Sequence, residues 1–391
     1  MSKILKKKNN SDVIVIGAGL TGVCAAITAA RRGARVRLIE KESVPGGTAL
    51  GLRHRFLCGL FSNSAGLPGK YLNRGLTEEF CARLSPGAQP LRMGKVWLLP
   101  YDPRRLVMVL VDLLTREKNI KVSYRSKANA CSCQQGRIES VRYSHHNKHY
   151  QLKAKVFIDA GSGILSQKCG AAQFLELSRR QMSGFALELV GVTWDDVLPI
   201  CVPYVLYQAV KRGDLPHYAR WTAVSASEQK GRVYLKLSLP VAASLPLAKK
   251  ISAAIVKILR QELSAFRLGK IGWHSQEVFS RDGGRFRGQY VFQDKDILEG
   301  KKFFDGIMKG AWPMEFWDPK RGPTYQYPAE DYYELPARSI RAKNVFNLFA
   351  AGRCVSAEPG AQASLRVGGL CLAMGEAAGN AAVELLSRLR K

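Results

Sequence analysis

The residues best suited to acid–base or thiol chemistry stand close together in the chain, at His54 and Cys58. A histidine titrates near neutrality, so His54 could act as a general acid or base; a surface or packing role is the alternative. Cys58 lies within the apolar run 56–61, where a cysteine is more often a small core residue than a redox thiol. Both remain candidate catalytic residues, because no other residue resembles a nucleophile.

A second candidate group consists of arginines suited to binding an anion. Arg281, Arg285 and Arg287 surround the glycine pair 283–284. The alternating spacing of Arg285 and Arg287 predicts that both guanidinium groups share one face of a strand, where they could contact a carboxylate in bidentate fashion. A solvated arginine face is an equally good interpretation in so basic a chain.

A glycine turn near the N-terminus could bind a dinucleotide. Gly17, Gly19 and Gly22 have the G-x-G-x-x-G spacing, follow an apolar run, open a helical pattern and precede Glu40 by 18 residues, counted from the last glycine. The first glycine permits the sharp turn, the second lets backbone approach a pyrophosphate, and the third lets helix and strand pack closely. Glu40 could accept hydrogen bonds from the hydroxyl groups of the adenosine ribose. This unit alone predicts FAD or NAD.

The elements that position these residues follow from apolar periodicity. Apolar runs predict parallel strands buried on both faces, and the stripe at i, i+3, i+4 and i+7 predicts amphipathic helices. We predict strands at 13–16, 36–39, 120–124, 137–143, 149–153, 156–160 and 345–350, and helices at 20–33, 102–117, 248–267 and 364–389. Asp102 and Pro103 are suited to the start of their helix.

Several of these stretches resemble known flavoproteins. Residues 12–47, with Gly46 and Gly47 soon after the acidic residue, are similar to the N-terminus of two-domain flavoproteins, and residues 156–163 resemble their second strand-and-glycine signature. Residues 349–357, 364–367 and 374–379 resemble the end of the FAD-dependent oxidoreductase family, which is related in fold to the fumarate reductase and succinate dehydrogenase flavoproteins. Residues 285–290 and 296–300 resemble its middle segment.

The resemblance implies FAD as the cofactor and assigns its contacts. It implies that the strand ending at Gly352 meets the ribityl chain and that the last helix points its N-terminus at the pyrimidine end of the flavin, where its dipole would stabilise negative charge. The implied cofactor-binding residues are Gly17, Gly19, Leu20, Thr21, Gly22, Glu40, Lys41, Gly46, Gly47, Thr48, Ala160, Gly161, Gly352, Arg353, Ser364 and Leu365.

The resemblance also bears on catalysis. Arg366 occupies a position that the family shares, so it is a further candidate for contacting flavin or substrate. Related enzymes attach flavin covalently to a histidine, but the residues around His54 do not match the anchoring motif. Residues 358–362 replace the polar histidine or acidic residues typical of relatives, which puts the transfer of their substrate chemistry in doubt.

Composition narrows the class of protein. Nine scattered cysteines predict reduced thiols, and no pair has the spacing of a metal site. The formal charge of +29 fits an anionic partner or a basic solvated surface; no nucleic-acid-binding motif accompanies it, so we favour the second and do not expect nucleic acid. The sequence contains no run of 18 apolar residues, so we expect no integral membrane segment. We expect a cytoplasmic protein, with contact to an anionic surface left open.

We therefore predict an α/β fold with a Rossmann-like FAD-binding domain, built from a parallel sheet with helices and a small antiparallel β-meander, and an inserted mixed α+β substrate domain. The FAD domain would be discontinuous, at 1–170 and 336–391, and the substrate domain would span 171–335. The sequence has no second glycine turn of this kind, so we predict no dedicated NAD(P)H domain. Hydride would instead pass between FAD and a small organic substrate, with an unidentified second electron donor or acceptor. The alternatives are an electron-transfer subunit docking an acidic protein or membrane, and an RNA-binding or RNA-modifying flavoprotein.

Overall fold

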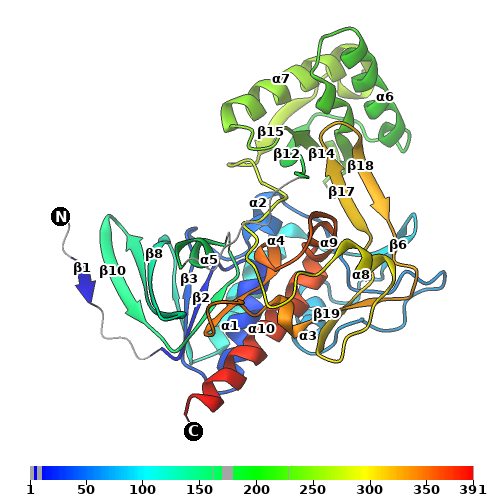
Figure 1. The fold of residues 1–391 in the computed structure, drawn as a ribbon. Helices are drawn as coiled ribbons and strands as arrows, with labels where there is room; N and C mark the ends of the chain where they lie inside the picture. The colour runs from blue at the N-terminus through cyan, green and yellow to red at the C-terminus, as the bar shows by residue number, and fades with distance from the viewer. Residues whose placement is uncertain (1–3, 7–10, 162, 170–178, 228, 391) are drawn as a thin grey trace.

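A five-stranded parallel sheet forms the centre of the molecule. The structure is a computed structural model that describes residues 4–6, 11–161, 163–169, 179–227 and 229–390 (Figure 1). The sheet has the order β20 (Leu348–Ala350), β11 (Val156–Asp159), β2 (Val13–Ile16), β3 (Val36–Ile39) and β7 (Ile120–Ser123), and every neighbouring pair is parallel. The residues of β2 and β11 are all buried, as their continuous apolar runs predict for strands covered on both faces.

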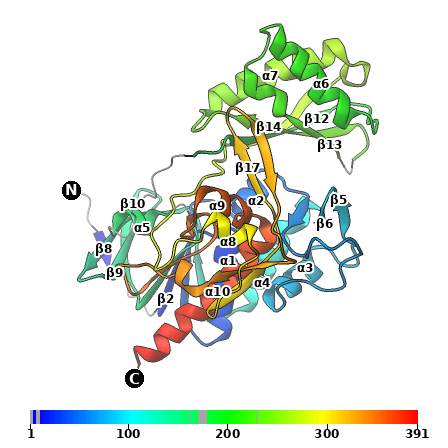
Figure 2. The ribbon, with the colours of Figure 1, turned by 45° about the vertical axis from the view of Figure 1, so that its right-hand side comes forward.

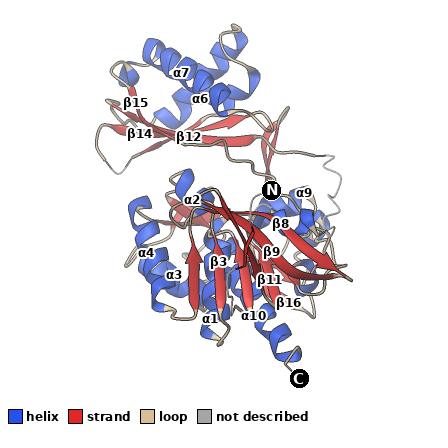
Figure 3. Ribbon diagram, turned by 90° about the vertical axis from the view of Figure 1, so that its left-hand side faces the viewer, coloured by secondary structure: helices blue, strands red, loops and turns tan. Residues whose placement is uncertain are grey.

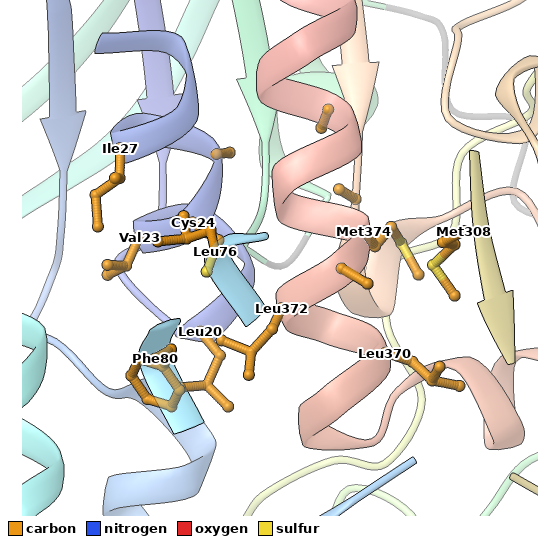
Figure 4. Packing of buried hydrophobic residues seen from close by; sticks show 14 of the residues in the cluster. Leu20, Val23, Cys24, Ile27, Leu76, Phe80, Met308, Leu370, Leu372 and Met374 are labelled. Atoms are coloured by element: carbon orange, nitrogen blue, oxygen red, sulfur yellow. The ribbon is translucent and has the colours of Figure 1, made fainter. Parts of the chain in front are cut away.

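Helices cover one face of this sheet. α1 (Leu20–Arg31) and α10 (Gly368–Arg388) pack side by side, and Figure 4 shows Leu20, Val23 and Leu372 in the cluster they share. A Cβ at Gly375 would lie 2.2 Å from the carbonyl oxygen of Thr21, so the small residue is needed for this close approach. α3 (Leu76–Leu84) and α4 (Pro103–Arg116) complete the layer. As predicted, the Asp102 side chain caps α4 by accepting a hydrogen bond from the Arg104 amide.

An antiparallel meander covers the other face. It consists of β8 (Ser126–Gln134), β9 (Arg137–His145) and β10 (Lys148–Lys153), with β1 (Ile4–Lys6) added in parallel to β10. Its inward residues Ile138, Val141 and Leu152 pack against Ile14 and Phe157 of the central sheet. α5 (Ile164–Lys168) lies beside β8. The predicted Rossmann-like architecture with its β-meander is therefore confirmed.

A second layered unit, which we call the cap, lies above the carboxyl ends of the central strands (Figures 1 and 2). Its antiparallel sheet has the order β13 (Ala223–Ala226), β14 (Arg232–Leu239), β12 (Ser183–Val190) and β15 (Lys270–His274). α6 (Leu198–Lys211) and α7 (Leu245–Glu262) cover the outer face of the sheet. Its other face is turned toward the unit built on the central parallel sheet, which we call the FAD part (Figure 3).

The period-two alternation of β14 decides which of its side chains face which way. Val233, Leu235 and Leu237 point into the hydrophobic cluster beneath α6 and α7. Tyr234 therefore points to the opposite face, where it packs with Leu52 of the FAD part, and Lys236 shares that face. A charged residue thus stands on the cap face that meets the cofactor-binding part.

One hairpin reaches from the FAD part to the cap, and the remaining elements are short. The hairpin of β17 (Met314–Asp318) and β18 (Gly322–Gln326) rises from the FAD part to the cap sheet (Figure 1). The others are α2 (Gly47–Gly51), β4 (Phe56–Cys58), β5 (Leu91–Met93), β6 (Val96–Pro100), α8 (Asp294–Leu298), β16 (Gly306–Gly310), β19 (Tyr333–Pro336), α9 (Pro359–Leu365) and the 3₁₀ turns His217–Trp221, Ser264–Phe266, Ala337–Ser339 and Gly352–Cys354. Met308, Trp312 and Tyr333 belong to the same hydrophobic cluster as α1.

The structure corrects the prediction of one helix over 364–389. α9 ends at Leu365, Val367 is extended with ψ 155°, and α10 starts at Gly368. A Cβ at Gly369 would lie 2.8 Å from the carbonyl oxygen of Cys58, so the chain turns here to pack tightly against β4. The break places Arg366 between two helices instead of within one. The predicted helix 248–267 likewise ends earlier, at Glu262.

Some predictions fall on residues outside the described ranges. These are Ser162 of the second glycine signature and the domain boundary at 170/171. Among the described residues, no helix is long and apolar enough to cross a membrane, and no group of His, Cys, Asp and Glu side chains has the makings of a metal site. None of the nine cysteines, which all lie in the described ranges, forms a disulfide.

Candidate functional site

Two glycines of the N-terminal turn are required by the packing of the protein itself. Gly17 has φ +93°, and a Cβ there would lie 3.0 Å from the Cα of Gly161. A Cβ at Gly22 would lie only 1.8 Å from the carbonyl oxygen of Gly17. Any larger residue at 22 would push α1 away from β2, which is the role of the third glycine in a nucleotide-binding turn.

Gly19, the N-cap of α1, differs, because a Cβ at this position would meet open space. Apart from its two chain neighbours, no described residue has a heavy atom within 4 Å of such a Cβ. The amides of Leu20, Thr21 and Gly22 belong to the first turn of the helix, so they have no carbonyl partner within it. An open space above free amides and a positive helix end fits the pyrophosphate of a dinucleotide.

The predicted ribose partner is held at the edge of this turn. Glu40 is 5% exposed, and its carboxylate accepts hydrogen bonds from the Ala18 and Glu42 amides. These bonds fix the side chain at the carboxyl end of β3, next to the glycine turn. The neighbouring Lys41 points outward and pairs with Glu277 at 3.1 Å.

Most of the other predicted cofactor residues gather around the same turn. The Gly46 amide donates to the Ala18 carbonyl at 2.8 Å, and a Cβ at Gly47 would lie 3.1 Å from the Gly19 Cα, with Thr48 next in α2. Ala160 and Gly161 end β11 directly beside Gly17. A Cβ at Gly352, where φ is +74°, would lie 2.8 Å from Thr21 Oγ1. Segments far apart in the sequence therefore meet at one point.

Three predicted cofactor residues direct their side chains into the protein. The Arg353 guanidinium donates to the Ser280 carbonyl at 2.9 Å. The Ser364 hydroxyl lies 2.6 Å from both Tyr333 Oη and the Trp312 carbonyl oxygen, and Leu365 is fully buried in the core. Contact between these residues and a cofactor would have to come from their backbone.

A cluster of charged residues lies where the cap faces the FAD part. We call it the cation cluster, and it consists of Lys236 on β14, Arg281 after β15, Arg366 between α9 and α10, and the single carboxylate Glu315 on β17. Trp317 lies among them. Its ring centroid is 4.3 Å from the Arg281 guanidinium carbon and 5.6 Å from Lys236 Nζ, and its indole N–H donates to Glu315 at 2.8 Å.

Two of the cations are anchored by one edge only. Arg281 is 6% exposed and donates through Nη1 to the Met182 carbonyl at 2.6 Å, but its Nη2 has no partner among the described residues. Arg366 donates through Nη2 to the Glu315 carbonyl at 3.2 Å and more loosely to the Gln181 side chain at 3.4 Å. Its Nε lacks a partner within the described part of the chain. Both side chains thus keep an unused buried donor.

The pKa values show how strongly this environment disfavours charge. Burial, together with the neighbouring cations, lowers the pKa of Lys236 to about 8 and that of Arg281 to about 9. Burial alone would raise the pKa of Glu315, but Arg366 and Lys236 outweigh it, so the pKa is lowered. At neutral pH three cations therefore stand against Glu315, with Asp282 acting on Arg281 and Arg366 from beside the cluster.

His54 and Cys58 border the cation cluster. Burial, helped by Lys236 and Arg366, lowers the pKa of His54 to about 3, so the imidazole is neutral at pH 7, and its buried Nε2 has no partner in the described structure. Burial raises the pKa of Cys58 to about 12, so it is a thiol and not a thiolate. His54 can therefore form one hydrogen bond at Nε2 as a neutral imidazole, as donor or acceptor according to its tautomer.

The cap contacts the residues on both sides of His54. The Tyr234 hydroxyl donates to the Leu52 carbonyl, and Arg53, at φ +44°, forms a 2.6 Å ion pair with Glu188. Arg55 donates to the Ala226 carbonyl and to the Ser227 hydroxyl. All three contacts lead to the cap sheet or its loops, so the position of the imidazole depends on the cap.

The structure thus brings together three of the four predicted catalytic residues, His54, Cys58 and Arg366, and separates the fourth. Arg285 donates to the Ala357 carbonyl at 3.1 Å, and its electrostatic neighbours are Asp282, Asp294 and Glu358.

The prediction that Arg285 and Arg287 share a strand face is wrong. Residues 283–287 form no strand, and Arg285 is buried whereas Arg287 is exposed. A Cβ at Gly283 would lie 2.0 Å from the Arg353 carbonyl oxygen, because the segment runs close against another loop and not beside a strand.

The sequence alone did not single out Lys236, Glu315 or Gln181. A usable signal exists for Lys236, since it is the one charged residue of the mostly apolar stretch 233–239. Glu315 and Gln181 offer no local signal, because their place in the cluster comes from the hairpin β17–β18 and from the approach to β12.

Comparison with known proteins agrees with this geometry. The model of the family "FAD dependent oxidoreductase" matches residues 12–388. Sarcosine oxidase subunit alpha of Rhizobium meliloti is 59% identical over 39 residues, which is 10% of this chain and only 4% of that protein. Among solved structures, a geranylgeranyl bacteriochlorophyll reductase-like protein of Thermoplasma acidophilum has a TM-score of 0.52 at 12% identity, covering 99% of this chain and 80% of that one. The anhydrotetracycline hydroxylase OxyS of Streptomyces rimosus also has a TM-score of 0.52 at 12% identity, and the match covers 97% of this chain and 63% of that one. At this identity, the likeness shows the fold.

Proposed function

The chain belongs to the FAD dependent oxidoreductase family and uses FAD, and we propose that it transfers a hydride between FAD and a small organic substrate held beneath the cap. One observation supports this most: His54 and Cys58 of the FAD part meet Lys236 and Glu315 of the opposite side at the cation cluster. Such a convergence of strongly shifted pKa values between two layers is typical of active sites.

The residues of the chain would divide the work. The glycine turn and the first turn of α1 would hold the pyrophosphate, and Glu40 would hold the ribose. FAD, when bound, supplies the hydride chemistry at N5 of its ring system. His54, neutral at pH 7, would bind the substrate through a hydrogen bond at Nε2, and the cap contacts around it would hold the imidazole in place.

The domain division stays a prediction. We propose the FAD part as 1–170 with 336–391, as predicted, and the cap as the core of the segment 171–335. Residues such as Phe292, Met308 and Tyr333 pack in the cluster of α1, so they would belong to the FAD part in packing although they lie in the inserted segment. The lack of a dedicated NAD(P)H domain and a cytoplasmic location also stay predictions.

The test is spectroscopic. Purified protein should show flavin absorbance near 450 nm, and this absorbance should fall under anaerobic conditions with one class of organic donor or, after chemical reduction, recover with one class of acceptor. His54→Gln should slow the change in absorbance, whereas His146→Gln, at an exposed turn, should not. Acid precipitation shows whether the flavin is attached covalently. Covalently bound flavin stays in the pellet with the protein, whereas free flavin stays in the supernatant.

The outcomes separate the alternatives. Colourless protein that takes up no FAD would contradict the proposal. Reduction only in the presence of an acidic protein partner would favour the electron-transfer subunit, and salt-sensitive retention of RNA would favour the RNA-binding alternative.

A further inference from the structure

We propose that Lys236, Arg281 and Arg366 form a binding site for the carboxylate group of the substrate. The inference rests on the proposed function, since it assumes that a substrate enters beneath the cap, and it adds the chemical class of that substrate. It concerns the same cation cluster and the donors that the protein itself leaves unused.

The charge of the cluster supports the proposal. Taking a cation out of water is costly unless an anion accompanies it, and here burial lowers the pKa of all three cations. Glu315 raises the pKa of all three cations and Asp282 raises the pKa of Arg281 and Arg366, so these carboxylates are fewer than the cations. An anionic ligand would supply the missing negative charge.

The unused donors support it independently of charge. Arg281 is more than nine-tenths buried, yet its Nη2 has no partner among the described residues. The Nε of Arg366 also has no partner among the described residues, and Arg366 lies close enough to Arg281 to lower its pKa. Buried donors without partners are rare in finished structures, and they are typical of sites that a ligand completes.

The geometry of the donors favours a carboxylate over a compact or strongly charged anion. Arginine presents a planar fork that matches the two oxygens of a carboxylate. Trp317 covers the face of Arg281 and already donates its indole N–H to Glu315, so the Arg281 edge stays available for an in-plane partner. Glu315 would repel a polyanion, because it remains charged within the cluster.

The surface cations of the molecule provide the contrast. Lys257, Arg260, Arg267 and Lys270 line a groove between α7 and β15, but these side chains are exposed. Water and salt screen such charges, so they need no specific anion. The cation cluster beneath the cap lacks this compensation.

The experiment titrates the oxidised holoprotein with acetate, succinate and benzoate, each against its neutral amide, at constant ionic strength. The readouts are the perturbation of the flavin absorbance and the thermal unfolding midpoint, so no turnover is needed. At least one carboxylate should bind, and its amide should bind at least about tenfold more weakly, as expected for the loss of a charge-assisted hydrogen bond.

Variants locate the site. Arg281→Met should weaken the binding carboxylate about tenfold or more, Arg281→Lys should weaken it less, and Lys270→Met on the exposed edge of the cap should leave it within about twofold. FAD content and circular dichroism confirm that each variant is folded. If Arg281→Met fails to fold, Lys236→Met serves in its place with the same expectation.

Two results would overturn the proposal. One is that no carboxylate binds better than its amide. The other is that the variants change the midpoint potential of the flavin but leave carboxylate affinity unchanged, which would mean that the cations serve the cofactor alone. Tight carboxylate binding without reduction of the flavin by any organic donor would instead contradict the proposed function and leave this inference standing.

Discussion

The glycine turn and the cation cluster are built in opposite ways. The turn is formed by the backbone of one short stretch, 17–22, in which three residues are glycines without a side chain. Its hydrogen-bond donors are backbone amides of α1. The cluster is made of long side chains, Lys236, Arg281, Glu315 and Arg366, which four separate segments bring together.

The difference explains what each region can do. Backbone amides at a helix start are fixed by the fold and accept any pyrophosphate, so the turn serves a whole family of cofactor-binding proteins. Side chains from several segments can be replaced one at a time, so the cluster can be matched to a particular ligand. We therefore expect cofactor affinity to depend on the turn and substrate choice to depend on the cluster.

The largest effect should come from enlarging Gly22. Gly22→Ala would place a Cβ 1.8 Å from the Gly17 carbonyl oxygen, so α1 has to shift; we expect a loss of about 3 kcal/mol in the free energy of unfolding and loss of FAD. Denaturant unfolding and flavin content measure both.

The matched control for Gly22 is Gly19→Ala, where the new Cβ has no atom within 4 Å from any described residue other than its chain neighbours. It should cost the apoprotein at most about 1 kcal/mol, because alanine is only a poorer N-cap than glycine, while FAD affinity falls. Equal destabilisation by both substitutions would show that the turn is not divided into packing and cofactor glycines.

A smaller effect should follow from removing the one acid of the cluster. Glu315→Gln removes the carboxylate that acts on Lys236 and leaves Arg281 and Arg366 with Asp282 alone, so we expect the protein to lose about 2 kcal/mol of stability at pH 7. Urea unfolding of this variant beside Glu384→Gln, at an exposed position, measures the effect. Unchanged stability would mean that the cations are better solvated than their burial indicates.

His54 should make the protein sensitive to acid. Its pKa in the folded state is about 3, below the ordinary value of 6.5, so the unfolded chain binds the proton more readily between these values. Stability should therefore fall as the pH drops from 6.5 toward 3, and His54→Gln should lose less over this window than the wild type. His146→Gln should behave as the wild type. Identical pH profiles for all three would contradict the burial of His54.

Cys58 should show the smallest effect. Its pKa of about 12 keeps it a thiol, so iodoacetamide at pH 8 should label it only after unfolding, as peptide mass spectrometry would show. Cys58→Ala should change stability by about 1 kcal/mol or less, because little volume is lost. Rapid labelling of the folded protein would assign Cys58 to a thiolate role at the flavin.

The same difference decides how much the sequence could predict. The strand–turn–helix unit at 13–40 follows from local spacing, and so do the buried strand 156–159 and the cap of α4 at Asp102. These features depend on residues that are neighbours in the chain, so periodicity and capping patterns detect them.

The cation cluster depends on contacts that no local pattern encodes. Glu315 reaches it through a hairpin that rises from the FAD part, and Arg366 reaches it because the last helix is broken at Val367, where Gly369 packs on β4. A break of this kind is decided by tertiary packing and not by propensity. The misplaced strand at Arg285–Arg287 has the same origin, since the alternating pattern was real but the segment lies against a loop.

The most direct test is to measure the dissociation constant of FAD for the apoprotein in three forms: wild type, Gly19→Ala and Arg281→Met. The account predicts that Gly19→Ala weakens FAD binding about tenfold or more, because its Cβ fills the space above the helix amides, and that Arg281→Met stays within about threefold of the wild type. If Arg281→Met weakened FAD as much as Gly19→Ala, the cofactor and substrate sites would not be separate, and the central claim would be wrong.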